Sequence, residues 1–204
     1  MASKKPDRKI LVLDKGPQFS EAERSAFLAR VMRDFDYGAD YNDHLPESVK
    51  TKVSTIKTGD SPQFNYNRLF GTGGTALHFQ GWMVRPVEAD MRVKSLFGYG
   101  RDWPISYGEL EPWLLDAEKV IGVAGNHLDN PYAEPRTDAF PMPAHAFSWC
   151  DREILAPALK KLGMTAHSRP MAVNSHVYDD RAECNACRIC RFCPTGARYS
   201  PCRR

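Results

Sequence analysis

Four cysteines stand at intervals of three residues near the end of the 204-residue chain, and a proline follows the last of them directly. They are Cys184, Cys187, Cys190 and Cys193. Gaps of two residues bring several thiolates around one compact centre, and Pro194 prevents the run from continuing as a helix. The run therefore predicts a cysteine-ligated metal centre, and this part of the chain must fold around it.

The identity of the metal is open on the residues alone. Iron–sulfur is favoured over zinc, because structural zinc is usually held by two separated pairs of ligands. A disulfide-bonded loop is a third alternative, although thiols this close in sequence rarely pair without strain. The neighbouring Arg188, Arg191 and Arg198 would offset the charge of a thiolate-ligated cluster, or are simply solvated. Cys150 and Cys202 are treated as spare thiols. Cys150 is expected to be a small buried side chain, and Cys202 could replace a ligand, although it lies nine residues after Cys193.

Charge and hydropathy argue against a nucleic-acid partner and against a membrane-spanning helix. The chain has 28 basic and 25 acidic side chains, a net charge of +3, and its basic residues are scattered, so no nucleic-acid partner is expected. The longest apolar stretches, such as Ile10–Leu13 and Val120–Ala124, are far shorter than the ~20 residues of a membrane-spanning helix. The basic first residues lack the apolar core of a secretory signal. We therefore expect no direct membrane span.

Two capping boxes mark the starts of helices. Ser20 with Glu23 precedes a helical stretch that continues to about residue 35, and Ser106 with Glu109 precedes another that ends at Gly122. The second stretch carries apolar residues at helical spacing. These residues are Leu110, Trp113, Leu114, Ala117, Val120 and Ile121.

The rest of the chain divides into shorter elements. Arg8–Asp14 is an apolar run typical of a buried parallel strand. Residues 38–70 are polar and rich in turns, which predicts a surface loop. Residues 126–143 carry four prolines and should cross the surface as an extended excursion. A third helix is expected over 151–162, followed by an extended stretch over 164–174.

A glycine-rich turn, GTGGTALH, occupies residues 71–78. Three glycines in four positions allow backbone conformations and close approaches that side chains would block. Taken alone, this pattern indicates only a turn.

Three blocks together resemble a known family. They are GTGGTALHFQGWMVR at 71–85, YGRDWPISYGELEPWLLDAEKVIGVAG at 99–125, and AVNS at 172–175 followed by CPTGARYS at 193–200. In this order they resemble the iron–sulfur-containing flavoprotein subunits of sugar and polyol dehydrogenases in the glucose-methanol-choline family. The resemblance implies an α/β fold. We expect an incomplete Rossmann-like FAD-binding domain over 1–125, with loop-rich insertions, and a connecting and cluster-binding segment over 126–204.

The resemblance also implies roles for individual residues. Asp14, at the end of the predicted strand, would bind the adenosine ribose of FAD, as an acid at that position can. In the family, one glycine-rich stretch runs beside the flavin and its pyrophosphate. By the resemblance, this role falls to Gly71, Gly73, Gly74 and Thr75. His78 would lie near the flavin, and in some relatives a histidine at this point is bonded to it covalently. The four clustered cysteines would hold the iron–sulfur cluster.

The implied activity is FAD-dependent oxidation of CH–OH groups in sugars, polyols or sugar acids. Electrons would pass from the flavin through the cluster to a cytochrome-type acceptor subunit, and a small chaperone-like subunit would accompany the enzyme. Such complexes work at the periplasmic face of the inner membrane, to which partner subunits attach them.

Two parts of the family pattern do not occur in this sequence. They are the first strand with its GxGxxG loop and the distal catalytic histidine, so no catalytic residue is assigned and the chain alone is expected to be inactive. A truncated reading frame is the leading interpretation. A self-standing iron–sulfur electron-transfer or metal-binding module is the alternative, and a separately encoded subunit completed in trans is a third.

Overall fold

The computed structural model divides into two compact units. Unit 1 comprises Met1–Phe79 with Ser200–Arg204, and unit 2 comprises Gln80–Tyr199. The residues that the structure describes are Leu11, Leu13, Gln18 and residues 20–34, 55–56, 64–65, 72–77 and 79–201. Each unit is described by itself.

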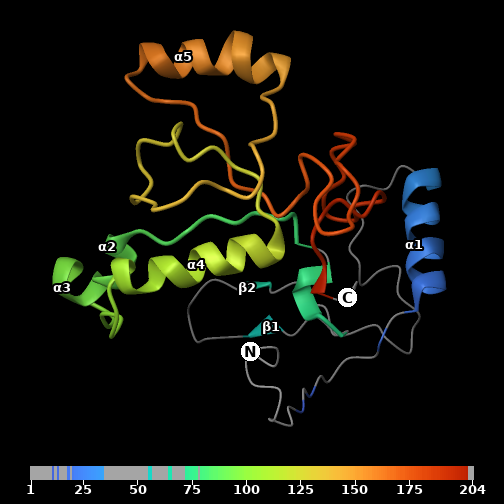
Figure 1. Ribbon diagram of the computed structural model, residues 1–204, viewed down its shortest axis with the longest axis horizontal. Helices are drawn as coiled ribbons and strands as arrows, with labels where there is room; N and C mark the ends of the chain where they lie inside the picture. Colours follow the sequence, from blue (N-terminus) through green and yellow to red (C-terminus); the bar gives the residue numbers. More distant parts are fainter. Residues whose placement is uncertain are drawn as a thin grey trace. The chain divides into compact units, whose positions relative to one another are not determined.

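Helix α1, Glu21–Asp34, is the longest element described in unit 1 (Figure 1). Its start is a capping box in which the Glu23 amide donates to Ser20 Oγ over 3.2 Å. In return, Glu23 Oε2 accepts from the Ser20 amide over 2.8 Å. These bonds satisfy backbone donors that the first helical turn leaves without partners. The helix predicted from this box is confirmed.

Unit 1 also contains two short strands and one 3-10 turn. Strand β1, Thr55–Ile56, pairs antiparallel with β2, Phe64–Asn65. The surface loop predicted for residues 38–70 is therefore wrong at these four positions, because paired strands can be too short to show an alternating sequence pattern. The 3-10 helix η3 spans Gly74–Leu77, and the Leu77 side chain is buried.

The parallel strand predicted at Arg8–Asp14 is not supported at the two positions that the structure describes. Leu11 and Leu13 lie outside any strand and are 81% and 84% exposed. A buried parallel strand needs neighbours on both sides, and these two side chains have no such cover. The other residues of the run lie outside the described part of the chain.

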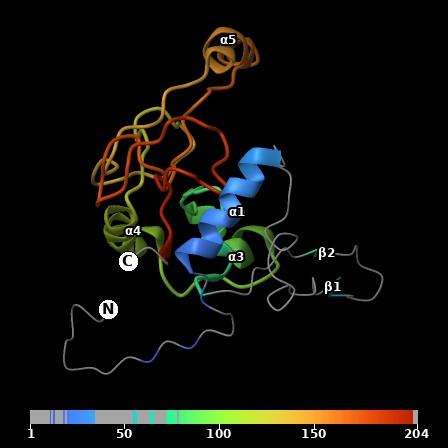
Figure 2. The same ribbon diagram turned by 90° about the vertical axis from the view of Figure 1, so that its right-hand side faces the viewer.

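Five helical elements form the regular structure described in unit 2. They are α2 (Glu88–Met91), α3 (Val93–Phe97), α4 (Tyr107–Ile121), the π-helical turn η4 (Asp151–Leu155) and α5 (Ala156–Lys161). Figure 1 shows α2 and α3 beside the start of α4, and both views show α5 standing apart from α4 (Figure 2). None of the described helices is long and apolar enough to cross a bilayer.

Helix α4 has the predicted ends but not the expected buried face. Ser106 and Glu109 form its capping box, and Gly122 ends it in the left-handed conformation, with φ 74°. Trp113, which contributed to the apolar spacing, is 65% exposed. The buried residues instead include two glutamates, which satisfy their charges within the protein. The buried positions are Tyr107, Glu111, Leu115 and Glu118.

The core of unit 2 is made by extended segments rather than by a continuous sheet. Met171 forms isolated bridges with both Trp82 and Ala124, and Ala124 bridges Met142 as well. Val173 bridges Arg198 farther along. Each contact involves single residues, so the described residues form no parallel sheet. The predicted Rossmann-like α/β fold is not confirmed.

The proline-rich excursion over 126–143 is extended and mostly exposed, as predicted, with Leu128 82% and Tyr132 61% exposed. It contains no helix or strand beyond the bridge at Met142, which is buried with 4% exposure. The Arg136 side chain is 6% exposed and reaches α4. The surface path is therefore confirmed for most of the segment, while the Arg136 and Met142 side chains attach it to the interior of the unit.

The third predicted helix, over 151–162, is present as η4 followed by α5, and Gly163 follows it with φ 71°. The expectation that Cys150 is buried is wrong, because its side chain is exposed. It immediately precedes η4, and η4 and α5 contain no buried residue. The segment lacks a packing partner that could cover the thiol.

Candidate functional site

The cysteine run forms an irregular loop in unit 2. Its four thiols are free, with Cys193 buried, Cys184 and Cys190 partly buried and Cys187 exposed. The backbone takes positive φ angles at Cys193, at Ala186 (56°) and at Arg188 (62°). Because left-handed residues reverse the chain direction, the run curls back on itself instead of extending.

The thiols lie close enough to affect one another electrostatically. Burial raises the pKa of Cys184, the hydrogen bond from the Ala186 amide opposes this, and the thiols of Cys187 and Cys193 raise the pKa further. Burial also raises the pKa of Cys190, with Cys184, Cys193 and Cys187 adding to the effect. The four sulfur atoms therefore share one region of the loop.

Backbone amides donate to two of the sulfur atoms. The Arg198 amide donates to Cys193 Sγ over 3.1 Å, and the Ala186 amide donates to Cys184 Sγ over 3.4 Å. Hydrogen bonds of this kind favour thiolate and tune the potential of iron–sulfur clusters. Of the three arginines considered in the sequence, Arg198 thus contributes its backbone amide, and its side chain is buried at 3% exposure.

The donor chemistry of this loop fits an iron–sulfur cluster, but the sulfur atoms are not arranged as a ligand set. Among the described residues, no group of three or more His, Cys, Asp or Glu side chains is positioned to hold one metal ion. The structure therefore brings Cys184, Cys187, Cys190 and Cys193 into one loop, while their role as ligands stays a prediction.

Asn174 holds the base of the cysteine loop. Its side chain is fully buried, and Nδ2 donates to the carbonyls of Tyr178 (3.0 Å) and Arg181 (2.8 Å). The Asn174 carbonyl accepts from the Cys184 amide over 2.9 Å, and its amide donates to the Ala197 carbonyl over 3.0 Å. One residue thus ties together both ends of the loop. Asn174 belongs to the AVNS block, but nothing in that sequence pattern predicts this role.

Two further contacts attach the loop region to the rest of unit 2. His145 Nε2 lies 3.0 Å from the Val173 carbonyl, so this nitrogen carries the proton, because a carbonyl only accepts. Arg181 donates to the Ile121 carbonyl at the end of α4 over 2.6 Å. A side chain at Gly122 would meet this guanidinium 2.5 Å from its Cβ. The sequence offered no signal for these contacts, since the partners are far apart in the chain.

The glycine turn of unit 1 is described in part. Gly73 and Gly74 have φ of 97° and 54°, and a Cβ added at Gly74 would meet no atom within 4 Å. Thr75 is exposed. The turn therefore presents open backbone, as a site for cofactor phosphates requires. The other predicted flavin contacts, Asp14, Gly71 and His78, lie outside the described residues.

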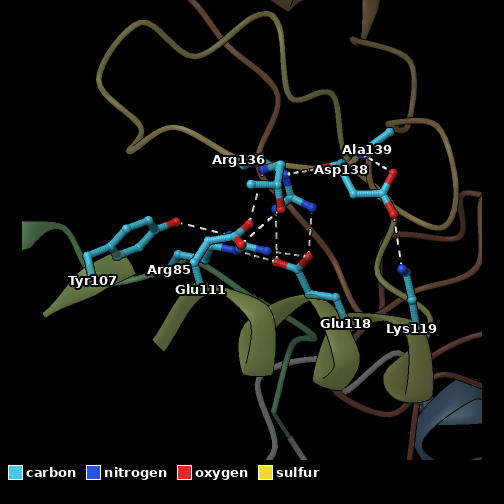
Figure 3. A network of polar contacts seen from close by, with 9 residues as sticks. Arg85, Tyr107, Glu111, Glu118, Lys119, Arg136, Asp138 and Ala139 are labelled. Atoms are coloured by element: carbon cyan, nitrogen blue, oxygen red, sulfur yellow. Dashed lines mark hydrogen bonds and ion pairs between the residues drawn. The ribbon is translucent and has the colours of Figure 1, made fainter. Parts of the chain in front are cut away.

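A buried charge network centred on α4 was not predicted from the sequence (Figure 3). Glu118 accepts two hydrogen bonds from Arg85, at 2.7 and 2.9 Å, and two from Arg136, at 3.1 and 2.8 Å. Burial alone would raise the pKa of Glu118, but the bonds from both arginines outweigh it and lower the pKa. The carboxylate therefore remains charged inside the unit.

Glu111 forms the second centre of this network. It accepts from the Thr137 amide (3.2 Å), from Thr137 Oγ1 (3.0 Å) and from Arg85 (3.3 Å). Burial opposes its charge, but these bonds keep its pKa below the usual value. A sequence signal existed, because Glu111 and Glu118 are two helical turns apart and thus share a face.

Comparison with known proteins shows what this chain is similar to. It is 29% identical over 202 residues to the fructose dehydrogenase large subunit of Gluconobacter japonicus, a match that covers 94% of this chain and 37% of that protein. It is 31% identical over 155 residues to the gluconate 2-dehydrogenase flavoprotein of Pantoea cypripedii, covering 63% and 25%. The paromamine 6'-oxidase of Streptomyces fradiae is 29% identical over 131 residues, covering 62% and 23%. No protein-family model matches the chain.

These relatives confirm the resemblance found in the sequence. The chain is a homologue of flavoprotein subunits of the glucose-methanol-choline type, with the fructose and gluconate dehydrogenase subunits among its relatives. It spans about a third of the length of the first relative and a quarter of the second.

Proposed function

We propose that this chain supplies part of an FAD-dependent oxidoreductase that acts on CH–OH groups of sugars, polyols or sugar acids. The observation that carries the proposal is the similarity to a fructose dehydrogenase large subunit along 94% of the chain. A self-standing iron–sulfur module would need similarity only around the cysteines. The extent of the match, which includes the glycine turn, favours the dehydrogenase.

On the flavin side, the residues proposed to contact FAD are Asp14, Gly71, Gly73, Gly74, Thr75 and His78. The left-handed glycines and the open space beside Gly74 support this assignment, since backbone amides can then approach the cofactor closely. When bound, the flavin would accept hydride from the alcohol carbon.

On the electron-exit side, Cys184, Cys187, Cys190 and Cys193 would hold an iron–sulfur cluster. The shared position of the thiols and the amide donors to Cys184 and Cys193 support this role. The cluster would pass electrons to a cytochrome-type subunit, and a small chaperone-like subunit would assist assembly. One relative is named a large subunit, which implies that it has subunit partners. We place the complex at the periplasmic face of the inner membrane.

The test is anaerobic reduction of the protein purified with its native subunits. Fructose, sorbitol and gluconate are added separately, and the flavin absorbance is followed. At least one of these substrates should bleach the flavin and reduce an added cytochrome-type acceptor. Cys190→Ser should retain flavin bleaching but lose acceptor reduction, while the exposed Cys150→Ser variant should retain both. Absence of flavin, or a flavin that no sugar, polyol or sugar acid bleaches, would contradict the proposal.

A further inference from the structure

The segment that follows the last cysteine of the run folds into a tight turn. The Gly196 amide donates to the Cys193 carbonyl over 3.2 Å, which closes a turn over the sequence Cys-Pro-Thr-Gly. Proline at the second position and glycine at the fourth favour such a turn. The turn brings the Thr195 side chain back to the cysteine, with Thr195 Oγ1 3.9 Å from Cys193 Sγ.

Neighbouring backbone holds this turn in place. The Ala197 carbonyl accepts from the Asn174 amide over 3.0 Å, and the Tyr199 amide donates to the Ala172 carbonyl over 2.8 Å. Ala197 is fully buried, and Cys193 is 8% exposed. The Cys193 sulfur therefore lies where water has little access, and a hydrogen bond to it is electrostatically stronger than one in water.

The hydroxyl group of Thr195 is oriented by a second contact. Its oxygen accepts from the Ala197 amide over 3.4 Å, so its hydrogen is available for another acceptor. A thiolate has no hydrogen of its own, and the contact between Oγ1 and an ionised Cys193 therefore runs from the hydroxyl to the sulfur. The Arg198 amide donates to the same sulfur over 3.1 Å. Both donors come from the segment that directly follows Cys193.

This arrangement bears on the cluster that the proposed function places in the loop, because a cysteine bound to a metal is deprotonated. Reduction adds negative charge to a cluster and its sulfur ligands. A donor beside a sulfur atom stabilises this added charge, and hydrogen bonds to the sulfur atoms are among the features that set the potential of such clusters. A donor at Cys193 should therefore raise the reduction potential and make the cluster a better electron acceptor.

We propose that Thr195 tunes the cluster of this loop: its hydroxyl donates to the Cys193 thiolate and raises the reduction potential. Thr195 is not a ligand and acts only through Cys193. The inference rests on the proposed function, because it needs a cluster that Cys193 helps to hold. Thr195 is exposed, so its side chain can be replaced with little change in packing.

The test is a redox titration of the full chain after anaerobic reconstitution with iron and sulfide, followed by electron paramagnetic resonance. Thr195→Val keeps the shape of the side chain but removes the donor. At a fixed potential, the ratio of oxidised to reduced cluster should rise about threefold, as expected for one hydrogen bond. For a one-electron couple this is a fall of about 28 mV in the midpoint potential.

Two variants serve as controls. Thr195→Ser keeps the hydroxyl and should retain the potential of the unmodified chain. Thr165→Val makes the same change at an exposed position on another segment, and it should also leave the potential unchanged. All of these proteins should hold equal iron and acid-labile sulfide, because Thr195 is not a ligand.

The possible outcomes separate this inference from the proposed function. Equal potentials in Thr195→Val and the unmodified chain, with a cluster in both, would overturn the inference alone. An equal fall in Thr195→Ser would also overturn it, because the hydroxyl would then not be the cause. Loss of the cluster in Thr195→Val would show a structural role instead of tuning. Failure of the unmodified chain to take up a cluster would overturn the cluster assignment itself, and this inference with it.

Discussion

The charge network on α4 and the cysteine loop both place polar groups inside unit 2, but they differ in how those groups are satisfied. In the network, Glu118 accepts from two arginines and Glu111 accepts from Arg85 and Thr137. In the loop, Cys187 is exposed, and the pKa values of Cys184 and Cys190 are raised by burial. The network joins carboxylates to guanidinium groups, whereas Cys184 and Cys193 accept from backbone amides.

This difference separates a structural role from a binding role. A buried carboxylate with four hydrogen bonds has little capacity left for a ligand. Partly buried thiols with amide donors nearby can still take up a positively charged metal centre, which would favour their thiolate form. We therefore expect changes in the network to affect stability, and changes in the loop to affect cofactor content.

The largest effect should follow from Glu118→Ala. This change leaves Arg85 and Arg136 buried without their carboxylate, so the free energy of unfolding should fall by about 3–5 kcal/mol. Urea denaturation of the purified chain would measure it. The matched control is Asp138→Asn, which breaks the exposed pair with Lys119 and should change the midpoint very little. Equal effects of the two variants would contradict a buried network.

Asn174→Ala should have the next largest effect. The carbonyls of Tyr178 and Arg181 would lose their buried donor, at a cost of about 2 kcal/mol. The amide of Cys184, which donates to the Asn174 backbone, should exchange hydrogen faster as the base of the loop loosens. Asn126→Ala is the control, because Asn126 is exposed and holds only a local turn. Unchanged exchange at Cys184 in Asn174→Ala would show that this side chain does not hold the loop.

A smaller effect should separate two left-handed glycines. Gly122→Ala brings a Cβ within 2.5 Å of Arg181, whereas Gly163→Ala meets no atom within 4 Å, and both have φ above 70°. Both substitutions force alanine into a left-handed conformation at a similar cost. The difference between their changes in the free energy of unfolding therefore measures the steric clash of the new Cβ with Arg181. We expect Gly122→Ala to destabilise unit 2 by about 1 kcal/mol more. Equal urea midpoints for Gly122→Ala and Gly163→Ala would contradict the close contact between Gly122 and Arg181.

The smallest effect should be the response of the network to mild acid. The pKa of Glu118 is lowered in the folded chain from its ordinary value of 4.5. Its charge therefore contributes stability above pH 4.5, and this contribution is lost as the pH falls through the lower folded value. The stability difference between the unmodified chain and Glu118→Gln should thus stay constant from neutral pH down to about 5 and shrink below 4.5. A difference that shrinks already near neutral pH would contradict a lowered pKa.

Local signals in the sequence predicted the helices well. The capping boxes at Ser20 and Ser106 predicted the starts of α1 and α4, because they involve residues three positions apart. In these boxes the interacting groups lie within a few residues of one another, so a short sequence pattern is enough to predict the hydrogen bonds that form. The spacing of the cysteines predicted a common centre for their thiolates, and this metal centre stays a prediction, because the described thiols are not arranged as a ligand set.

Contacts between distant segments were not predictable in this way. The pairing of Glu118 with Arg85 and Arg136 spans 33 and 18 positions, and the apolar residues of α4 suggested a different buried face. Cys150 is exposed because η4 and α5 lack buried residues, which depends on packing rather than on residue type. The Rossmann-like sheet stays a prediction, since it rests on the family resemblance.

We propose, as the centre of this account, that the four cysteines of the run hold an iron–sulfur cluster and that Cys150 takes no part in it. Anaerobic reconstitution with iron and sulfide, followed by iron and acid-labile sulfide analysis, tests it most directly. The unmodified chain and Cys150→Ser should retain equal iron and sulfide, and Cys187→Ser and Cys190→Ser should lose most of both. Stoichiometric zinc without affinity for iron and sulfide, or an equal loss in Cys150→Ser, would contradict the claim.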